Sequence, residues 1–300
     1  STLPTTIMME CVRNNIPVAL SGAPMAGSTA PLTMAGTLAQ THAEQLAGIT
    51  LCQLINPGAP LLYGGIPGRA DLRSMNYCGG AVECGMMNAA IHQLSHHIQV
   101  PNYNSSGLSD SKLPDAQAGW EKGMTTLLAA MGGSNYVHHA AGMLESMLGL
   151  AYEQFVLDDE IIGMTRRVLQ GIEVDEEHLA AQVIKDVDVG GQFITADHTF
   201  EHMYDEYFMG NGVTDRSDRA TWTQAGEKDA WMRARDMVHT ILAQPEKSYI
   251  PEELDARIRQ EHDILLPQTS YETRTSCDRH SRAGTSSRTP IRDQNPEQIE

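Results

Sequence analysis

The sequence is poor in aromatic and in basic residues. Phe, Trp and Tyr make up 5% of its 300 positions, and 21 Lys and Arg stand against 38 Asp and Glu, a formal charge of −17. Polyanionic nucleic acids and anionic membrane surfaces bind to cationic partners. The charge balance therefore argues against nucleic-acid and membrane partners. The acid is concentrated in residues 151–267, which hold 25 acidic and 11 basic groups, whereas residues 1–150 hold 8 and 5.

Long apolar runs and paired cysteines are also missing. The most apolar stretch, 124–157, is interrupted by polar and charged residues and is too broken for a membrane-spanning helix. The five cysteines form no CxxC pair, and such a scattered set is typical of reduced thiols. No basic start followed by an apolar run is present, so no signal peptide is expected. These absences predict a cytoplasmic protein.

Short apolar runs alternate with longer helical stretches in the first 170 residues. Strands are predicted over 18–20, 61–63, 100–103 and 135–139, and helices over 5–15, 31–54, 79–99, 114–131 and 151–170. This alternation favours a parallel sheet with helical crossovers. The turn Gly22–Gly27 is not GxGxxG, which argues against a doubly wound nucleotide-binding sheet. The predicted fold is α/β, a (β/α)8 TIM-type barrel of which the four parallel strands within 1–171 form about half.

The sequence changes character after residue 171. Helices without strands are predicted over 174–187, 223–242 and 251–265, so residues 172–267 are expected to form an acidic helical region that packs on the barrel. Residues 268–300 have almost no large apolar side chains, which predicts a disordered tail. A half barrel leaves two unpaired sheet edges, so a homo-oligomer is an open alternative.

Candidate site residues lie where the predicted strands end. In β/α barrels, reacting groups occupy the carboxyl ends of strands and the loops after them. Those positions hold few strong acids or bases and several aromatic and amide side chains, which suits substrate holding more than proton transfer. The candidates for catalysis are Lys112, His138 and His139, and those for substrate binding are Tyr63, Arg69, Tyr103, Asn104, Asp110, Gln117 and Tyr136.

Each candidate also has a purely structural interpretation. Tyr63 and Tyr103 are as easily explained by packing in the barrel wall, and Lys112 by solvation in a polar loop. Adjacent residues of a strand point to opposite faces, so at most one of His138 and His139 is expected to face the barrel axis. The other histidine is expected to pack under a helix.

One segment resembles a metal site. Residues His198, Glu201 and His202 form the pattern HxxEH, in which two histidines one helical turn apart bind Zn²⁺ and the Glu acts as base. The chain has 12 histidines, which makes a chance match common, and no third ligand is evident in the sequence. A zinc-dependent hydrolase is therefore kept as an alternative, and no bound metal is expected.

Several motifs in order resemble those of one family. The supporting phrases are STAP at 28–31, NPGAP at 56–60, SDSKLPDAQAG at 109–119, YVHHAAG at 136–142 and GIEVDE at 171–176. Together they resemble the trimethylamine methyltransferase family, including its glycine betaine methyltransferase branch, over residues 21–266. The resemblance implies a β/α barrel that moves a methyl group from a methylated amine to the cobalt of a separate corrinoid protein. Family members are longer at the N-terminus, so the four strands would be the second half of the barrel.

The resemblance also implies a substrate. The trimethylamine branch carries pyrrolysine near Lys112, and an ordinary residue there indicates the branch that lacks pyrrolysine and uses quaternary amines such as glycine betaine. Aromatic faces suit a quaternary ammonium group, so the tyrosine candidates are expected to hold the cation, with Tyr136 discounted because it alternates with Val137. Arg69, Lys112 or one histidine would hold a substrate carboxylate. A non-catalytic fragment that binds only a partner protein remains the third hypothesis.

Overall fold

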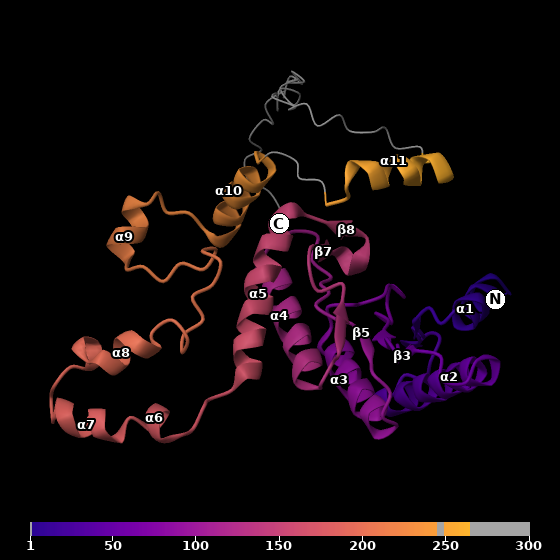
Figure 1. Cartoon of the computed structure of the whole chain (residues 1–300), viewed down its shortest axis with the longest axis horizontal. Coiled ribbons are helices and arrows are strands. Elements are labelled where there is room, and N and C mark those ends of the chain that lie inside the picture. Colours follow the sequence, from indigo (N-terminus) through magenta and orange to yellow (C-terminus); the bar gives the residue numbers. More distant parts are fainter. Residues whose placement is uncertain (1, 245–248, 265–300) are drawn as a thin grey trace, which may run out of the picture. The chain divides into compact units, whose positions relative to one another are not determined.

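The computed structural model describes residues 2–244 and 249–264 (Figure 1). The chain divides into two compact units, residues 1–241 and 242–300. The first unit begins with helix α1 (Thr2–Arg13) and contains every strand found among the described residues, and the second contains helix α11 (Glu252–Glu261). The predicted tail 268–300 lies outside the described residues. No described helix is both long enough and apolar enough to cross a membrane.

Four short parallel strands form the centre of the first unit. Strand β1 (Val18–Leu20) pairs with β3 (Leu61–Tyr63), and β5 (Tyr103–Ser105) pairs with β6 (Tyr136–His138). A parallel bridge from β3 to the residue before β5, together with a hydrogen bond from the Tyr63 amide to the Pro101 carbonyl at 2.8 Å, joins the two pairs. The strand order therefore follows the chain order, as successive β/α units require.

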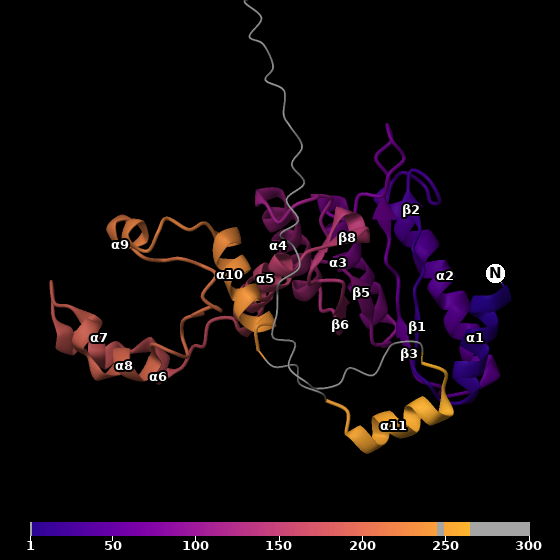
Figure 2. The same cartoon turned by 90° about the horizontal axis from the view of Figure 1, so that it is seen from above.

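Helices connect these strands in the predicted rhythm (Figures 1 and 2). They are α2 (Met34–Ile55), α3 (Val82–His97), α4 (Ala116–Met131) and α5 (Tyr152–Gln170). α4 begins where the Asp115 side chain accepts a hydrogen bond from the Ala118 amide at 3.0 Å, and α5 ends at Gly171, whose φ is 73°. Among the described residues neither β1 nor β6 has a second strand partner. The unit is thus a helix-rich α/β structure with short parallel strands, and the TIM-type barrel stays a prediction.

The strand boundaries differ from the prediction where polar residues are buried. β1 and β3 have the predicted bounds, but β5 covers Tyr103–Ser105 instead of 100–103. Asn104 and Ser105 had the character of loop residues, yet both are buried. The Asn104 side chain donates a hydrogen bond to Oδ1 of Asn88 on α3 at 2.6 Å. This bond satisfies the side-chain amide nitrogen of the buried residue, whereas its Oδ1 has no hydrogen-bond partner among the described residues.

Two additional strand pairs extend the loops after the main strands. β2 (Met25–Ala26) runs parallel to β4 (Gly68–Arg69), and β7 (Met143–Leu144) runs antiparallel to β8 (Gly149–Leu150). A short 3-10 turn, η1 (Glu145–Met147), links β7 to β8. None of these elements is predicted from the sequence, since each strand is only two residues long.

Up to residue 242, the acidic region after α5 consists of short helices and one longer one. The short elements are α6 (Glu176–Leu179), α7 (Ala181–Val187), η2 (Phe193–Thr195), α8 (Asp197–His202) and α9 (Arg219–Gln224), and the longer one is α10 (Ala230–Leu242). The predicted helix 174–187 is divided at Ala180, whose φ is 48°. Val156 of α5 shares a buried apolar cluster with Ala234 and Val238 of α10. This cluster packs the end of the region against α5.

Candidate functional site

The alternation of side chains along β5 and β6 brings several predicted site residues together. The register places Tyr103 beside Tyr136 and Ser105 beside His138, so these four side chains share one face of the strand pair. The Tyr103 hydroxyl lies 2.5 Å from Nδ1 of His138. The ring centroids of Tyr103 and Tyr136 are 5.7 Å apart, and those of Tyr136 and His138 are 6.1 Å apart. We call Tyr103, Tyr136 and His138 the aromatic cluster.

The second predicted histidine, His139, joins this cluster. Its ring stacks on that of His138 at a centroid distance of 3.5 Å, and its Nδ1 lies 2.8 Å from Oγ of Ser105. The expectation that His138 and His139 point to opposite faces is wrong. β6 ends at His138, and the φ of 67° at His139 turns its side chain back toward the strand. Burial, together with the nearby His138, lowers the pKa of His139, so it is neutral at pH 7.

The loop after β1 approaches the same cluster. Ser21 is within hydrogen-bonding reach of the Tyr103 side chain. Burial raises the pKa of Tyr103, so its hydroxyl keeps its proton at neutral pH. Tyr103 is 8% exposed, whereas Tyr136 is 54% exposed, so the cluster has a buried side and an accessible side. A ligand can therefore contact the exposed ring of Tyr136, which lies beside the buried ring of Tyr103.

Two other predicted substrate contacts lie on the opposite face. The Tyr63 hydroxyl is 2.9 Å from Nδ1 of His42 on α2, and Asn104 bonds to Asn88 on α3. Both predicted residues have no exposed surface. Burial also raises the pKa of Tyr63 to about 12. The register explains the separation, because Tyr63 is bridged to Asn102, which alternates with Tyr103. The structure therefore places Tyr63 and Asn104 in helix–sheet packing, apart from the aromatic cluster.

A cavity of about 980 Å³ lies among the loops that follow the strands. Three of the predicted residues line it, namely Arg69, Asp110 and Lys112. The Lys112 side chain is exposed, and its Nζ donates a hydrogen bond to the Asp110 carbonyl at 2.8 Å. Arg69 forms an ion pair with Glu83 at 3.4 Å. None of the three residues of the aromatic cluster lines this cavity, although the loop after β1 contributes Ala23 and Met25 to its lining and Ser21 lies near Tyr103.

Asp110 is held by hydrogen bonds from three segments. Its carboxylate accepts from the Gly80 amide at 3.3 Å and from the Ser146 hydroxyl, and its own amide donates to Glu121 at 2.8 Å. The predicted residue Gln117 is not among those that line the cavity. Its side-chain amide donates to the other carboxylate oxygen of Glu121 at 3.0 Å. Gln117 therefore supports the Asp110 segment through Glu121.

The cavity rim contains a strained turn that gives no signal in the sequence. Glu145, Ser146 and Met147 have φ values of 50°, 50° and 77°, although none of them is glycine. Each left-handed residue costs about 1–2 kcal/mol. The Glu145 amide donates to the Ser111 carbonyl at 2.8 Å, and the Ser146 amide to the Ser109 carbonyl at 2.7 Å. Tertiary hydrogen bonds thus hold this conformation at the edge of the cavity.

Sequence reasoning also missed a buried ion pair. Nζ of Lys122 on α4 lies 3.1 Å from Oδ2 of Asp158 on α5, and the two side chains are 0% and 1% exposed. Lys122 also donates to the carbonyls of Gly107 at 2.6 Å and Met143 at 3.0 Å. Asp158 accepts from the Gly142 amide at 2.7 Å. The pair therefore fixes the loops that follow β5 and β6. A helix position alone cannot reveal such a partner 36 residues away.

The HxxEH segment forms α8, outside the residues that line the cavity. The ring centroids of His198 and His202 are 4.3 Å apart, as expected for histidines one helical turn apart. Nε2 of His198 lies 3.2 Å from the Glu177 carbonyl. The segment is therefore a group of side chains separate from the cavity.

Parallel strands, helical crossovers and a cavity among the strand-end loops define an α/β protein with the geometry of a small-molecule site. The profile described as "Trimethylamine methyltransferase (MTTB)" matches residues 4–263. The chain belongs to the trimethylamine methyltransferase (MTTB) family.

Curated relatives carry two kinds of name. The chain is 39% identical over 248 residues to the glycine betaine methyltransferase of Desulfitobacterium hafniense (strain Y51), a match that covers 83% of this chain and 50% of that protein. It is 38% identical to the trimethylamine methyltransferase MttB of D. hafniense (strain DSM 10664 / DCB-2), over 84% of this chain and 50% of that protein. It is 37% identical to the trimethylamine methyltransferase MttB of Methanosarcina barkeri, over 79% of this chain and 47% of that protein. The chain thus spans about half the length of the curated relatives it matches.

Proposed function

We propose that this protein takes part in methyl transfer from a quaternary amine, such as glycine betaine, to the corrinoid cobalt of a partner protein. Membership of the trimethylamine methyltransferase family and the similarity to a glycine betaine methyltransferase support this proposal. The observation that carries it is the aromatic cluster, in which Tyr103 and Tyr136 stand side by side on parallel strands. In this proposal the four strands form about half of a TIM-type barrel.

The leaving group of this reaction needs no proton from the protein. When the C–N bond breaks, nitrogen keeps the electron pair, and a quaternary ammonium leaves as a neutral tertiary amine. No general acid is needed, which agrees with an aromatic cluster that contains no carboxyl group. The reduced corrinoid of the partner supplies the nucleophile that accepts the methyl group. This chain must then hold the cation, exclude water and align the C–N bond, and alignment alone can lower the barrier by several kcal/mol.

The aromatic cluster suits the cationic end of such a substrate. A desolvated cation–π contact contributes about 1–2 kcal/mol. The hydrogen bond between Tyr103 and His138 fixes the Tyr103 ring, and Ser21 lies beside the same side chain. His139, stacked on His138 and bonded to Ser105, holds the other end of the cluster. His138 and His139 therefore act as positioning residues in this proposal.

Lys112 is the best placed residue for a substrate carboxylate. Arg69 is already paired with Glu83, and His139 is neutral because burial lowers its pKa. Lys112 lines the cavity, and the one hydrogen bond described for its ammonium group goes to a backbone carbonyl, which leaves its charge uncompensated. Asp110 positions the segment that carries Lys112 through its bonds to Gly80 and Ser146.

Calorimetric titration with glycine betaine and with 3,3-dimethylbutanoate, in which carbon replaces the quaternary nitrogen, tests this assignment. The two molecules share a shape and a carboxylate, and only the first has a cationic centre. We expect the protein to bind glycine betaine and to bind the isostere at least tenfold more weakly. Tyr103→Leu should weaken glycine betaine binding about tenfold, and Tyr103→Phe, which keeps the ring, should weaken it less. Equal binding of both molecules, or a Leu variant with unchanged affinity, would contradict the proposal.

The methyl-transfer step requires a separate measurement. Chemically reduced cob(I)alamin, followed by its absorbance, reports methylation in the presence of glycine betaine. For the 300-residue chain alone we expect little or no turnover, because the proposed half barrel supplies only part of the pocket. Full turnover by this chain would refute the half-barrel proposal while leaving the proposed reaction standing.

A further inference from the structure

The helices that pack on the sheet differ sharply in charge. The next helix after α2, α3 and α4, which is α5, has six charged side chains in its 19 residues. A helix with one side on a sheet and the other in water normally carries charged side chains on its outer side. α2, α3 and α4 together contain only four residues with charged side chains, which are Glu44, Glu83, Glu121 and Lys122.

None of these four charged side chains occupies the outer side of its helix. Glu83 pairs with the arginine of β4 at 3.4 Å, and Glu121 accepts a hydrogen bond from the loop after β5 at 2.7 Å. Lys122 is buried. Glu44 lies toward the loop after β1, since a Cβ added at Gly22 would be 3.2 Å from its carboxylate. The outer side of the three helices is therefore uncharged.

Large apolar side chains stand on this outer side instead. Trp120 and Met131 of α4 are 62% and 65% exposed, and the exposed Met124 lies between them on the same side of the helix. Met86 of α3 and Leu46 of α2 are exposed as well. We call the outer side of α2, α3 and α4, with these five side chains, the neutral face. Trp and Met are enriched, and charged residues depleted, at the centre of protein interfaces.

The neutral face is continuous, because α3 packs against both α2 and α4 (Figures 1 and 2). α3 and α4 approach closely at Gly85, where an added Cβ would lie 2.9 Å from the side chain of Leu128. Helices of 16 to 22 residues with axes about 10 Å apart present an outer area on the order of 700 Å². Each partner in a typical stable interface buries about 800 Å². The neutral face therefore has roughly the area that a stable dimer needs.

α4 also has an open notch beside Trp120. Gly119 and Gly123 lie one helical turn apart, and a Cβ added at either would meet nothing within 4 Å. Glycine inside a helix is less favourable than alanine, and packing within the single chain does not require it at these two positions. Glycine also allows another backbone to approach closely. The notch therefore suits contact with a helix of a partner.

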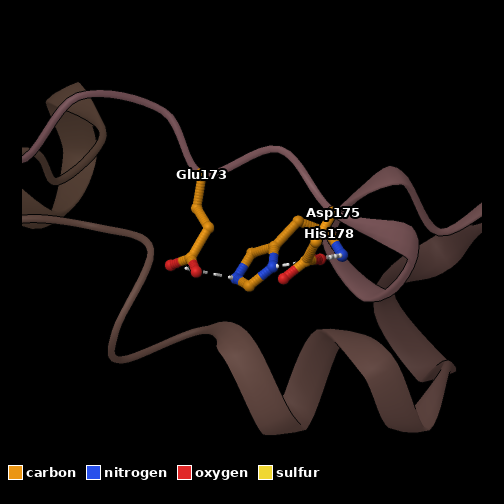
Figure 3. A group of neighbouring side chains, drawn as sticks. All are labelled: Glu173, Asp175 and His178. Atoms are coloured by element: carbon orange, nitrogen blue, oxygen red, sulfur yellow. Dashed lines mark hydrogen bonds and ion pairs between the residues drawn. The ribbon is translucent and has the colours of Figure 1, made fainter.

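The acidic region after α5 has the opposite character. Glu173 and Asp175 are exposed and flank the ring of His178 (Figure 3). Nδ1 of His178 lies 2.7 Å from Oδ1 of Asp175, and its Nε2 lies 3.8 Å from Oε2 of Glu173. Two chains that each carry −17 repel each other where carboxylate-rich surfaces of this kind meet. The neutral face allows two copies to meet without bringing carboxylates together.

We propose that two copies of this chain associate through the neutral face, with Trp120 and the notch at Gly119 and Gly123 near a two-fold axis. In a two-fold interface the same surface meets itself, so a charge near the axis would face its own copy. The absence of charge on the neutral face satisfies this requirement. The proposal does not rest on the proposed methyl transfer.

Two other occupants fit this face less well. A protein that acts on a ligand in the cavity approaches the loops after the strands, which lie at the ends of the helices and not on their outer side. The remainder of the proposed barrel would join at the edges of β1 and β6, which have no second strand partner among the described residues. A second copy of this chain is left as the partner.

Sedimentation equilibrium of the full chain tests the proposal. We expect a mass of twice 32.8 kDa that falls toward that of one chain on dilution. Trp120→Glu places two carboxylates near the axis and should raise the Kd of the dimer at least about tenfold. Leu169→Glu, at an exposed apolar position of α5, is the matched control and should dimerise as the unmodified chain does. Far-UV circular dichroism verifies that both variants are folded.

Gly123→Ala is an independent test of the notch. The space around Gly123 is open in the single chain, so alanine should raise the thermal stability of the monomer. The same methyl group fills the notch, so it should weaken the dimer. These opposite effects on monomer and dimer are not expected if the glycine has only a structural role within the chain.

Salt gives a third measurement. Added NaCl screens the repulsion between two acidic chains, and the neutral face has no ion pairs for salt to weaken, so the Kd should stay constant or fall. The mass of a single chain at every concentration would overturn the proposal, as would a dimer that weakens with salt. A dimer that Trp120→Glu and Gly123→Ala leave unchanged would indicate association through the edges of β1 and β6 and would overturn it too.

Discussion

Nζ of Lys122 on α4 lies 3.1 Å from Oδ2 of Asp158 on α5, with both side chains removed from solvent. Burial raises the pKa of Asp158 and lowers that of Lys122, and each partner's charge opposes the effect on the other. The desolvation of such a pair is compensated only when the remaining donors and acceptors are satisfied. Here backbone groups of Gly107, Gly142 and Met143 supply those contacts.

Asp158→Asn is expected to destabilise the protein by about 3–5 kcal/mol, because it leaves the Lys122 ammonium buried without a counter-charge. Urea unfolding at pH 7, followed by far-UV circular dichroism, measures this loss. The control is Asp159→Asn, an exposed neighbour on the same helix whose carboxylate accepts one hydrogen bond from Asn211 at 3.0 Å. It should cost less than about 1 kcal/mol. Equal losses in the two variants would show that the ion pair is unimportant.

His92 of α3 predicts a dependence of stability on pH. It has no exposed surface, and burial lowers its pKa to about 4. Between this value and the ordinary pKa near 6.5, the unfolded chain binds the proton and the folded chain does not, so stability falls as the pH falls. The part due to His92 should be about 2 kcal/mol between pH 7 and pH 5. Between pH 7 and pH 5, the free energy of unfolding of His92→Leu should therefore fall by about 2 kcal/mol less than that of the original chain.

Urea unfolding of both proteins at pH 7 and pH 5 isolates this contribution. Asp158 acts in the opposite direction, because a raised carboxyl pKa favours the folded state as the pH falls, but it is present in both proteins. His97→Leu, an exposed position on the same helix, should keep the pH dependence of the original chain. If His92→Leu keeps it as well, the prediction is wrong.

Lys112 provides a test of substrate orientation that rests on the proposed function. Lys112→Gln should weaken glycine betaine binding about tenfold, since a charge-assisted hydrogen bond contributes about 1.5–3 kcal/mol. Choline has the same cationic head and no carboxylate, so its affinity should not change. Calorimetric titration with both ligands gives the comparison. An equal loss of affinity for choline would show that Lys112 maintains the shape of the cavity and does not bind the carboxylate.

The strained turn predicts an unusual response at Met147. Its φ of 77° favours glycine, so Met147→Gly should be neutral or stabilising by up to about 1 kcal/mol. Met147→Val, with a β-branched side chain, should destabilise by about 1–2 kcal/mol. Thermal unfolding of the two variants measures the difference. If valine is tolerated as well as glycine, the turn does not hold the left-handed conformation in solution.

The sequence predicts the order of strands and helices well because local residue patterns determine that order. β1 and β3 are short apolar runs with turn residues after them, and α4 and α5 have clear ends at Asp115 and Gly171. The predicted boundaries of helices and strands are wrong where contacts between residues far apart in the sequence determine them. Asn104 continues β5 through its pairing with Val137 of β6 and its side-chain bond to Asn88 of α3, and Ala180 divides the predicted helix 174–187 at a residue without a breaker signal.

The candidate site is predicted less completely, for reasons of geometry. Tyr103, Tyr136 and His138 share a face because of the register between β5 and β6, and residue spacing alone does not give that register. Strand alternation assigns Tyr63 to the helix side once its bridge to Asn102 is known. The side chain of His139 points opposite to the expected direction because its backbone is left-handed, a conformation that the residue type histidine does not predict.

The turn Glu145–Met147 has a consequence for the order in which the protein folds. Three successive residues in an unfavourable conformation cannot form early, because the local chain alone does not compensate their cost. The compensation comes from the carbonyls of Ser109 and Ser111 in the loop after β5, which is itself bonded to Glu121 of α4. We therefore expect the rim of the cavity to form after the strands and helices beneath it.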